Sequence, residues 1–385
     1  MTVKERFLKA LNGEVPDRLP VTTHHVQPYF LSKYMNGISY HDFFIKFGLD
    51  SIVWIVPHLP NKDKGDFYDP TQKELAFLES RRIINNDWQI EWKDLPDNNF
   101  LARRYNFITP KGTLSMVTKS DDKSSMVTEY LIKEKGDINL LGEYMTYPKC
   151  DVKEVNRVVE KYGNNALIRS HIPGFDVFGQ PGCWQDASCL VGIEKLIIAT
   201  FDDPEWVHSL LKILFERKKY YLKSMNGAKY DLLELGGGDA STTVISPKIF
   251  REFVAPYDSK LIALAHKSGQ KVVYHTCGGM MPILEDIVAM NPDAMETFTP
   301  PDMGGDTDLK KAKKRIGDKV CMIGGFDQFH YFQGCTPEKT RSAVRKCFKE
   351  AGSNGGYILA PSDHFFDADL QLIEAFADEA RKCIY

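Results

Sequence analysis

The stretch Lys271–Gly279, KVVYHTCGG, has the pattern of a short buried strand that ends in two glycines. A helical pattern covers residues 247–268 just before it. A second helical pattern at 281–290 leads to another apolar run at 293–298. Strand–helix units that repeat in this way predict a parallel sheet.

The same alternation extends over most of the chain. Eight short apolar runs could form buried strands, at Leu19–His24, Asp50–Val56, Ala166–His171, Asp231–Leu235, Lys271–His275, Asp293–Phe298, Lys319–Gly324 and Gly356–Pro361. Helical patterns separate most of them, among others at Asp203–Ser224, Pro247–Ser268, Met281–Met290, Pro337–Ala351 and Asp369–Cys383. Eight such units predict an α/β fold of the (β/α)8, or TIM, barrel type, and 385 residues suit such a barrel with insertions.

One segment departs from this alternation. Residues from about 63 to 148 are too long for one crossover, and Arg81–Trp92 and Ala102–Lys119 alternate apolar and polar side chains around a turn at Thr109–Gly112. We therefore expect a single domain over residues 1–385 with a small antiparallel β insertion in its N-terminal third.

Composition excludes several classes of protein. The net charge is −3 with no clustered basic face, which argues against nucleic-acid binding. No apolar run approaches the ~20 residues of a membrane span, and the N-terminal segment lacks the apolar core of a signal peptide. The eight cysteines include no C-x-x-C pair, so we expect reduced thiols in a cytoplasmic protein.

The quoted stretch also holds a candidate metal site. His275 and Cys277 are two residues apart on an extended segment, so both face one side, and both side chains are good zinc ligands. Glu296 ends the next strand, and Asp363 and His364 follow the last one. Either of the last two could be the final ligand. The simpler alternatives are strand-end packing for the pair, a rim salt bridge for Glu296 and a helix cap for Asp363.

Other polar and aromatic residues should also lie at the carboxyl ends of the strands, where the active sites of such barrels form. The candidate catalytic residues are Glu234, Asp239 and His171. The candidate substrate-binding residues are His24, Tyr29, Trp54, Phe175 and Asp327. Each could instead be an ordinary rim, turn or core residue.

Several motifs together resemble the uroporphyrinogen decarboxylase superfamily. They are VISPKIFREFVAPY at 244–257, the H-x-C-G strand, IGGFD at 323–327, GGYILAP at 355–361 and, more loosely, KERFLKALNGEVPDRLPV at 4–21. The resemblance covers residues 150–385 well. True decarboxylases of this family carry an arginine-rich motif near the N-terminus, whereas VTTHHVQPY at 21–29 has no arginine to hold a porphyrin carboxylate.

The methyltransferase branch of the superfamily fits better. The resemblance implies a zinc site in which His275, Cys277 and Glu296 match the expected ligands, while Asp363, beside His364, stands near the place of a final cysteine. A carboxylate or imidazole in place of that cysteine makes zinc a harder Lewis acid than a thiolate would. A harder zinc favours a methyl ether over a thiol as the substrate.

The resemblance therefore implies an O-demethylase-type methyltransferase. It would move a methyl group from a small methoxylated, aromatic substrate to a Co(I) corrinoid on a small partner protein. The alternatives are a methylcobalamin:thiol methyltransferase of the coenzyme M type, a decarboxylase-like lyase, and a barrel that docks a corrinoid protein without catalysis. The sequence also allows a homodimer.

Overall fold

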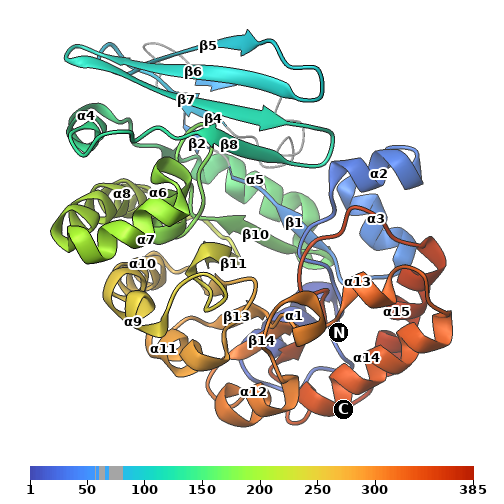
Figure 1. Ribbon diagram of the computed structural model, residues 1–385. Coiled ribbons are helices and arrows are strands. Elements are labelled where there is room, and N and C mark those ends of the chain that lie inside the picture. The colour runs from blue at the N-terminus through green and yellow to red at the C-terminus, as the bar shows by residue number, and fades with distance from the viewer. Residues whose placement is uncertain (57, 60–65, 69–80) are drawn as a thin grey trace.

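A parallel β-sheet forms the centre of the molecule. The computed structural model describes residues 1–56, 58–59, 66–68 and 81–385 (Figure 1). Seven strands pair in parallel in the order β1 (Ile52–Trp54), β10 (Leu167–His171), β11 (Leu232–Gly236), β12 (Val272–His275), β13 (Ala294–Thr297), β14 (Cys321–Gly324) and β15 (Tyr357–Ile358). Seven of the eight predicted runs are therefore strands, as expected.

The eighth run, Leu19–His24, closes the ring with a single β-bridge between Val21 and Leu359. The N–H of Leu359 donates to the carbonyl of Pro20 at 2.9 Å, and the N–H of Asp50 donates to the carbonyl of Val21 at 2.7 Å. The segment thus lies between β15 and β1. Pro20 has no N–H to donate, which is one reason why the segment pairs over so short a length. The predicted barrel is confirmed.

Helices surround the strands (Figure 1). Those that link the strands include α5 (Val152–Tyr162), α6 (Cys183–Val191), α7 (Ile193–Asp202), α8 (Pro204–Ser224), α10 (Ala255–Lys267), α11 (Leu284–Ala289), α12 (Leu309–Ile316) and α14 (Pro337–Ala351), and α15 (Leu370–Lys382) follows the last strand. The N-terminal helices are α1 (Val3–Leu11), α2 (Pro28–Met35) and α3 (Tyr40–Phe47). Among the described helices, none combines the length and the apolar character that crossing a bilayer requires.

The helix predicted over 247–268 is present, but it is not a regular α-helix throughout. It consists of α9 (Pro247–Ile249), a π-helical turn at Phe250–Val254 and then α10. Pro256 has no N–H for the bond that a regular α-helix would make one turn back, which accounts for the change of register.

The N-terminal third contains the predicted antiparallel sheet. It consists of β5 (Gln89–Leu95), β6 (Leu101–Thr109), β7 (Gly112–Ser120) and β8 (Ser125–Glu129), and it lies as a separate layer across the barrel (Figure 1). The tight turn at Thr109–Gly112 is where the sequence placed it. Residues 63–65 and 69–80 of the expected insertion lie outside the described residues.

Candidate active site

The parallel register of the barrel sets four candidate side chains at the ends of neighbouring strands. His171 on β10 pairs with Glu234 on β11, and His275 on β12 pairs with Glu296 on β13. Gly236, two residues after Glu234, pairs with His275. The carboxyl ends of neighbouring strands therefore hold acidic and imidazole groups within reach of each other, as active sites of this fold do.

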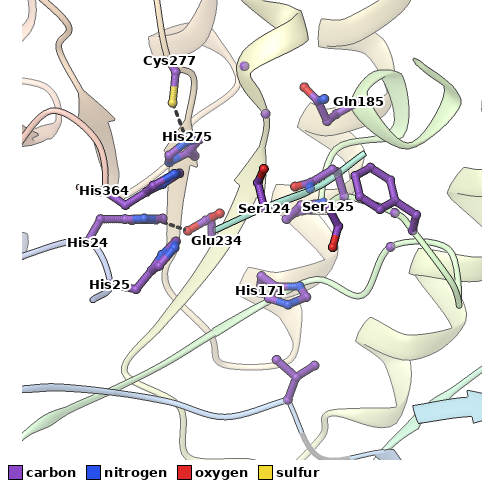
Figure 2. A pocket seen from close by; sticks show the side chains of 18 of the residues that line it. His24, His25, Ser124, Ser125, His171, Gln185, Glu234, His275, Cys277 and His364 are labelled. Atoms are coloured by element: carbon purple, nitrogen blue, oxygen red, sulfur yellow. Dashed lines mark hydrogen bonds and ion pairs between the residues drawn. The ribbon is translucent and has the colours of Figure 1, made fainter. Parts of the chain in front are cut away.

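A cavity of about 450 Å³ opens at these strand ends. Figure 2 shows His24, His25, His275 and His364 gathered on one side, with Ser124, Ser125 and Gln185 across from them. The apolar part of the lining includes Trp54, Val56, Phe175, Val177, Phe178 and Phe366. Ser124 lies in the turn between β7 and β8 and Ser125 begins β8, so the inserted sheet supplies one wall of the cavity.

His275 is held between Cys277 and Glu296. Its Nε2 lies 3.0 Å from Cys277 Sγ, and its Nδ1 lies 2.9 Å from Glu296 Oε1. Because an ionised carboxylate only accepts hydrogen bonds, Nδ1 carries the proton and Nε2 faces the thiol. Burial and the nearby Asp363 carboxylate raise the pKa of the Cys277 thiol well above its usual range.

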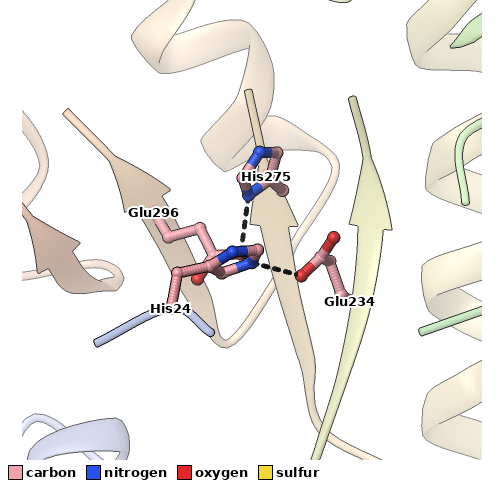
Figure 3. A group of neighbouring side chains, drawn as sticks. All are labelled: His24, Glu234, His275 and Glu296. Atoms are coloured by element: carbon pink, nitrogen blue, oxygen red, sulfur yellow. Dashed lines mark hydrogen bonds and ion pairs between the residues drawn. The ribbon is translucent and has the colours of Figure 1, made fainter. Parts of the chain in front are cut away.

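Arg169 on β10 joins the two buried glutamates. It is 1% exposed, and its guanidinium contacts Glu234 Oε2 at 2.6 Å and forms an ion pair with Glu296. His24 Nε2 lies 2.8 Å from Glu234 Oε2 and 3.4 Å from Glu296 Oε1 (Figure 3). The guanidinium carbon also lies 4.3 Å from the centre of the Trp54 ring.

The charges in this cluster shift the protonation equilibria of its members. Burial alone would raise the pKa of Glu234, but His24, His275 and Arg169 lower it to about 2. Burial would lower the pKa of His275, but Glu234 and Glu296 raise it to about 9. The same carboxylates outweigh burial at His24 and raise its pKa. The inner cluster therefore places two ionised carboxylates beside Arg169, and the carboxylates favour the protonated form of both imidazoles.

One described set of side chains has donor atoms that lie close together, and a second set of possible ligands lines the cavity. The inner set is His24, Glu234, His275 and Glu296, whose donor atoms all lie within 4.8 Å of one another. Arg169 already forms ion pairs with both of its carboxylates and would repel a divalent cation. The outer set is His275 Nε2, Cys277 Sγ and Asp363, which face the cavity. Nitrogen, sulfur and carboxylate oxygen are the donors that zinc takes in proteins.

Asp363 and His364 form a pair of their own. Asp363 Oδ1 lies 2.9 Å from His364 Nδ1 and accepts the His364 backbone N–H at 2.7 Å. The His364 ring stacks on His25 with centroids 5.2 Å apart. The following helix α15 begins at Leu370, so Asp363 does not cap it.

Four of the residues singled out from the sequence are not among the described residues that line the cavity; one is Glu296, which lies behind His275. Asp239 Oδ2 accepts a hydrogen bond from Gln185 at 2.9 Å and another from Ser188. Asp327 caps the short helix α13 (Gln328–Tyr331). The hydroxyl of Tyr29 accepts from a lysine one helical turn away at 2.7 Å. His24, Trp54, Phe175, His171 and Glu234 do line the cavity.

Arg169 and Phe366 were not predicted from the sequence. For Arg169 a signal was present. It is the one arginine in the predicted buried strand ALIRSH at 166–171, and a buried guanidinium requires carboxylate partners. For Phe366 the sequence holds no comparable signal, because its place at the cavity depends on how a loop folds.

The closed ring of strand–helix units, with titratable groups clustered at its carboxyl end, defines a TIM-barrel protein with the architecture of an enzyme. The family model for uroporphyrinogen decarboxylase (URO-D) matches residues 146–383, and the chain belongs to this family.

Similar proteins in this family include both decarboxylases and methyltransferases. Uroporphyrinogen decarboxylase of Chlorobaculum tepidum is 25% identical over 185 residues, which cover 48% of this chain and 49% of that protein. Methylated-thiol–coenzyme M methyltransferase of Methanosarcina mazei is 25% identical over 161 residues, 42% of this chain and 41% of that protein. The matched segments thus span about half the length of these curated relatives.

The fold has a counterpart among solved structures. A methyltransferase from Methanosarcina mazei covers 99% of this chain and 99% of its own chain, with a TM-score of 0.62 and 16% identity. At this identity the likeness supports the fold of the whole chain, including the part outside the family match.

Proposed function

We propose that this protein is a zinc-dependent methyltransferase that moves a methyl group from a methoxylated aromatic compound to a Co(I) corrinoid carried by a partner protein. The observation that carries the proposal is the His275–Cys277 pair, which faces a partly apolar cavity and is backed by Glu296. Membership of the URO-D family and the similarity to a methylated-thiol–coenzyme M methyltransferase support it.

We assign zinc to the outer donors: His275 Nε2, Cys277 and Asp363. Glu296 then serves as the carboxylate that accepts the Nδ1 proton of a ligating histidine, an arrangement common around protein zinc. Zinc binding would also convert the buried Cys277 thiol, whose pKa is raised, into a thiolate. When bound, the metal supplies a Lewis acid that stabilises the oxygen released as the methyl group departs.

The apolar side of the cavity suits an aromatic ring. Trp54, Phe175 and Phe366 offer aromatic surfaces, and Ser124 and Ser125 of the inserted sheet also line the cavity. A methoxyarene placed between them would be largely removed from water, which strengthens electrostatic interactions at the reacting oxygen.

His171 suits a substrate that carries a hydroxyl group. Its Nδ1 lies 3.1 Å from the carbonyl oxygen of Ile172, which can only accept, so Nδ1 carries the proton. Burial lowers the pKa of His171 and favours the neutral ring. Nε2 is then an acceptor, and it has no partner among the described residues although the side chain lines the cavity. A methoxyphenol of the guaiacol type would donate its O–H there.

The cavity is poorly suited to a porphyrin polycarboxylate. Among the described lining residues, Lys123 is the one lysine or arginine, and its ammonium group lies 3.5 Å from Asp367. Recognition of several carboxylates requires several unpaired cations. This observation argues against the decarboxylase alternative.

A thiol substrate is the second candidate. The similarity to methylated-thiol–coenzyme M methyltransferase favours it. The carboxylate of Asp363 among the outer donors favours the ether, because fewer thiolates leave the zinc harder. Methylation of cob(I)alamin by a methoxyphenol, compared with its methylation by a methyl thioether, distinguishes the two.

The first experiment measures zinc by mass spectrometry in the wild-type protein, in Cys277→Ala and in the control Cys321→Ala, which removes a buried thiol on β14. We expect about one zinc per chain, lost in Cys277→Ala and retained in Cys321→Ala. Loss of zinc should coincide with loss of cob(I)alamin methylation, followed by its absorption spectrum. A wild-type protein that methylates cob(I)alamin without zinc would refute the metal mechanism.

A further inference from the structure

A second, much smaller cavity of about 10 Å³ lies in the barrel on the inner side of the candidate active site. Its lining includes Thr23, His24, Arg169 and Ser362, together with Glu296. Two of these residues immediately precede residues of the site: Thr23 precedes His24, and Ser362 precedes Asp363.

Four buried polar atoms meet at this cavity without a partner. Thr23 Oγ1, His24 Nδ1, Arg169 Nε and Ser362 Oγ have no hydrogen bond to any other described group. The side chains of Thr23, Arg169 and Ser362 are almost fully buried, at 1%, 1% and 0% exposure. Native proteins seldom leave one such group unsatisfied, and four around one cavity indicate a shared ligand.

We propose that this cavity is a binding site for one internal water molecule. Arg169 Nε can only donate, whereas the hydroxyls of Thr23 and Ser362 can donate or accept. The water would accept from Arg169 and donate to one hydroxyl. The two remaining bonds of the water go to His24 Nδ1 and to the other hydroxyl. If Nδ1 accepts from the water, this hydroxyl donates to the water; if Nδ1 donates, the hydroxyl accepts. All four atoms are therefore satisfied whether or not His24 is protonated. Buried waters characteristically make two to four hydrogen bonds of this kind.

The chemistry of the lining excludes other small ligands. A metal cation would lie against the N–H of Arg169, which has no lone pair to coordinate it. A halide would lie beside the Glu296 carboxylate, which lines the same cavity. The volume is close to that of a single water-sized probe, so a larger solute does not fit.

The water would position the inner cluster. It would bind His24 Nδ1, while His24 Nε2 contacts Glu234. It would also bind Arg169 Nε, while the terminal nitrogen Nη2 of Arg169 binds both glutamates. It would also join the segment that closes the barrel, Leu19–His24, to the end of the last strand, where one β-bridge is formed.

The test is a crystal structure of the wild-type protein at a resolution that shows ordered water. We expect a difference-density peak within hydrogen-bonding distance of the four atoms. The absence of a peak would overturn the proposal. A peak that gives a bromine anomalous signal in crystals grown with sodium bromide would also overturn it, because the ligand would then be a halide.

A pair of variants gives an independent measurement. Thr23→Val removes one partner of the water with little change of shape, and Thr307→Val removes a buried, unpartnered hydroxyl elsewhere. We expect the melting temperature to fall by a few degrees more in Thr23→Val than in Thr307→Val. In a crystal structure of Thr23→Val we expect the 2.8 Å contact between His24 and Glu234 to lengthen. Equal melting temperatures with unchanged density and an unchanged contact would contradict the positioning role.

Discussion

Arg169 gives the most direct test of the charge arrangement inside the barrel. Arg169→Met retains much of the apolar stem and removes the guanidinium, which is 1% exposed and contacts Glu234 at 2.6 Å and Glu296 as an ion pair. Removing one partner of a buried ion pair costs about 3–5 kcal/mol, because the remaining charge stays buried. Two carboxylates each lose their arginine partner here and keep only histidine partners, so we expect a loss of at least about 3 kcal/mol in the free energy of unfolding.

The measurement is urea-induced unfolding of chelator-treated protein at neutral pH. The matched control is Arg217→Met, in which an arginine that is 2% exposed loses its ion pair with Asp176, outside the inner cluster. Both variants should be destabilised. Adding Glu234→Gln should restore part of the stability of Arg169→Met but none of that of Arg217→Met, because it removes one of the unpaired charges. A loss below about 1 kcal/mol in Arg169→Met, or no recovery in the double variant, would refute the reasoning.

Three further substitutions test other parts of the site and its support. Glu296→Gln should weaken zinc binding about 10–100-fold in a chelator competition while leaving zinc bound at saturation; complete loss would make Glu296 itself a ligand. His171→Ala should lower kcat/KM for a 2-methoxyphenol about 5-fold more than for 1,2-dimethoxybenzene, the worth of about one hydrogen bond; equal losses would remove the acceptor role. Burial raises the pKa of Asp258 to about 6 from 3.8. The folded protein therefore binds this proton more tightly than the unfolded chain does. The free energy of unfolding should fall by about 3 kcal/mol as the pH rises from about 4 through 6. Unfolding measured across this range should lose that slope in Asp258→Asn; an unchanged slope would contradict the assignment.

The sequence predicted the barrel because its strands are local features. Each is a short apolar run bounded by turn residues, and seven of the eight runs form strands. The proximity of His275 and Cys277 was also predictable, since residues two apart on an extended segment share a face. Pro256 marked the break in the helix at 247–268, although the apolar periodicity concealed it.

The rest depends on contacts between distant segments. Arg169 meets Glu296 across 127 positions of sequence, and His24 meets Glu234 across 210. Nothing local shows that Asp239, beside a glycine-rich turn, would be held by Gln185 and Ser188 instead of facing the cavity. Likewise, the inserted sheet was predictable as a meander, but the contribution of its β7–β8 turn to the cavity was not.

Charge balance explains why two donor sets can lie so close together. In the inner set, the carboxylates of Glu234 and Glu296 lie beside Arg169 and His24, whose pKa the same carboxylates raise. In the outer set, a Cys277 thiolate and the Asp363 carboxylate would be balanced by one Zn²⁺. Each set therefore contains its own opposite charges, so neither has to draw a counter-ion from the other. His275 connects them, with Nδ1 toward the inner carboxylate and Nε2 toward the outer thiol. A change of charge in the inner set should therefore alter zinc affinity through His275, even where the substituted side chain does not touch the metal.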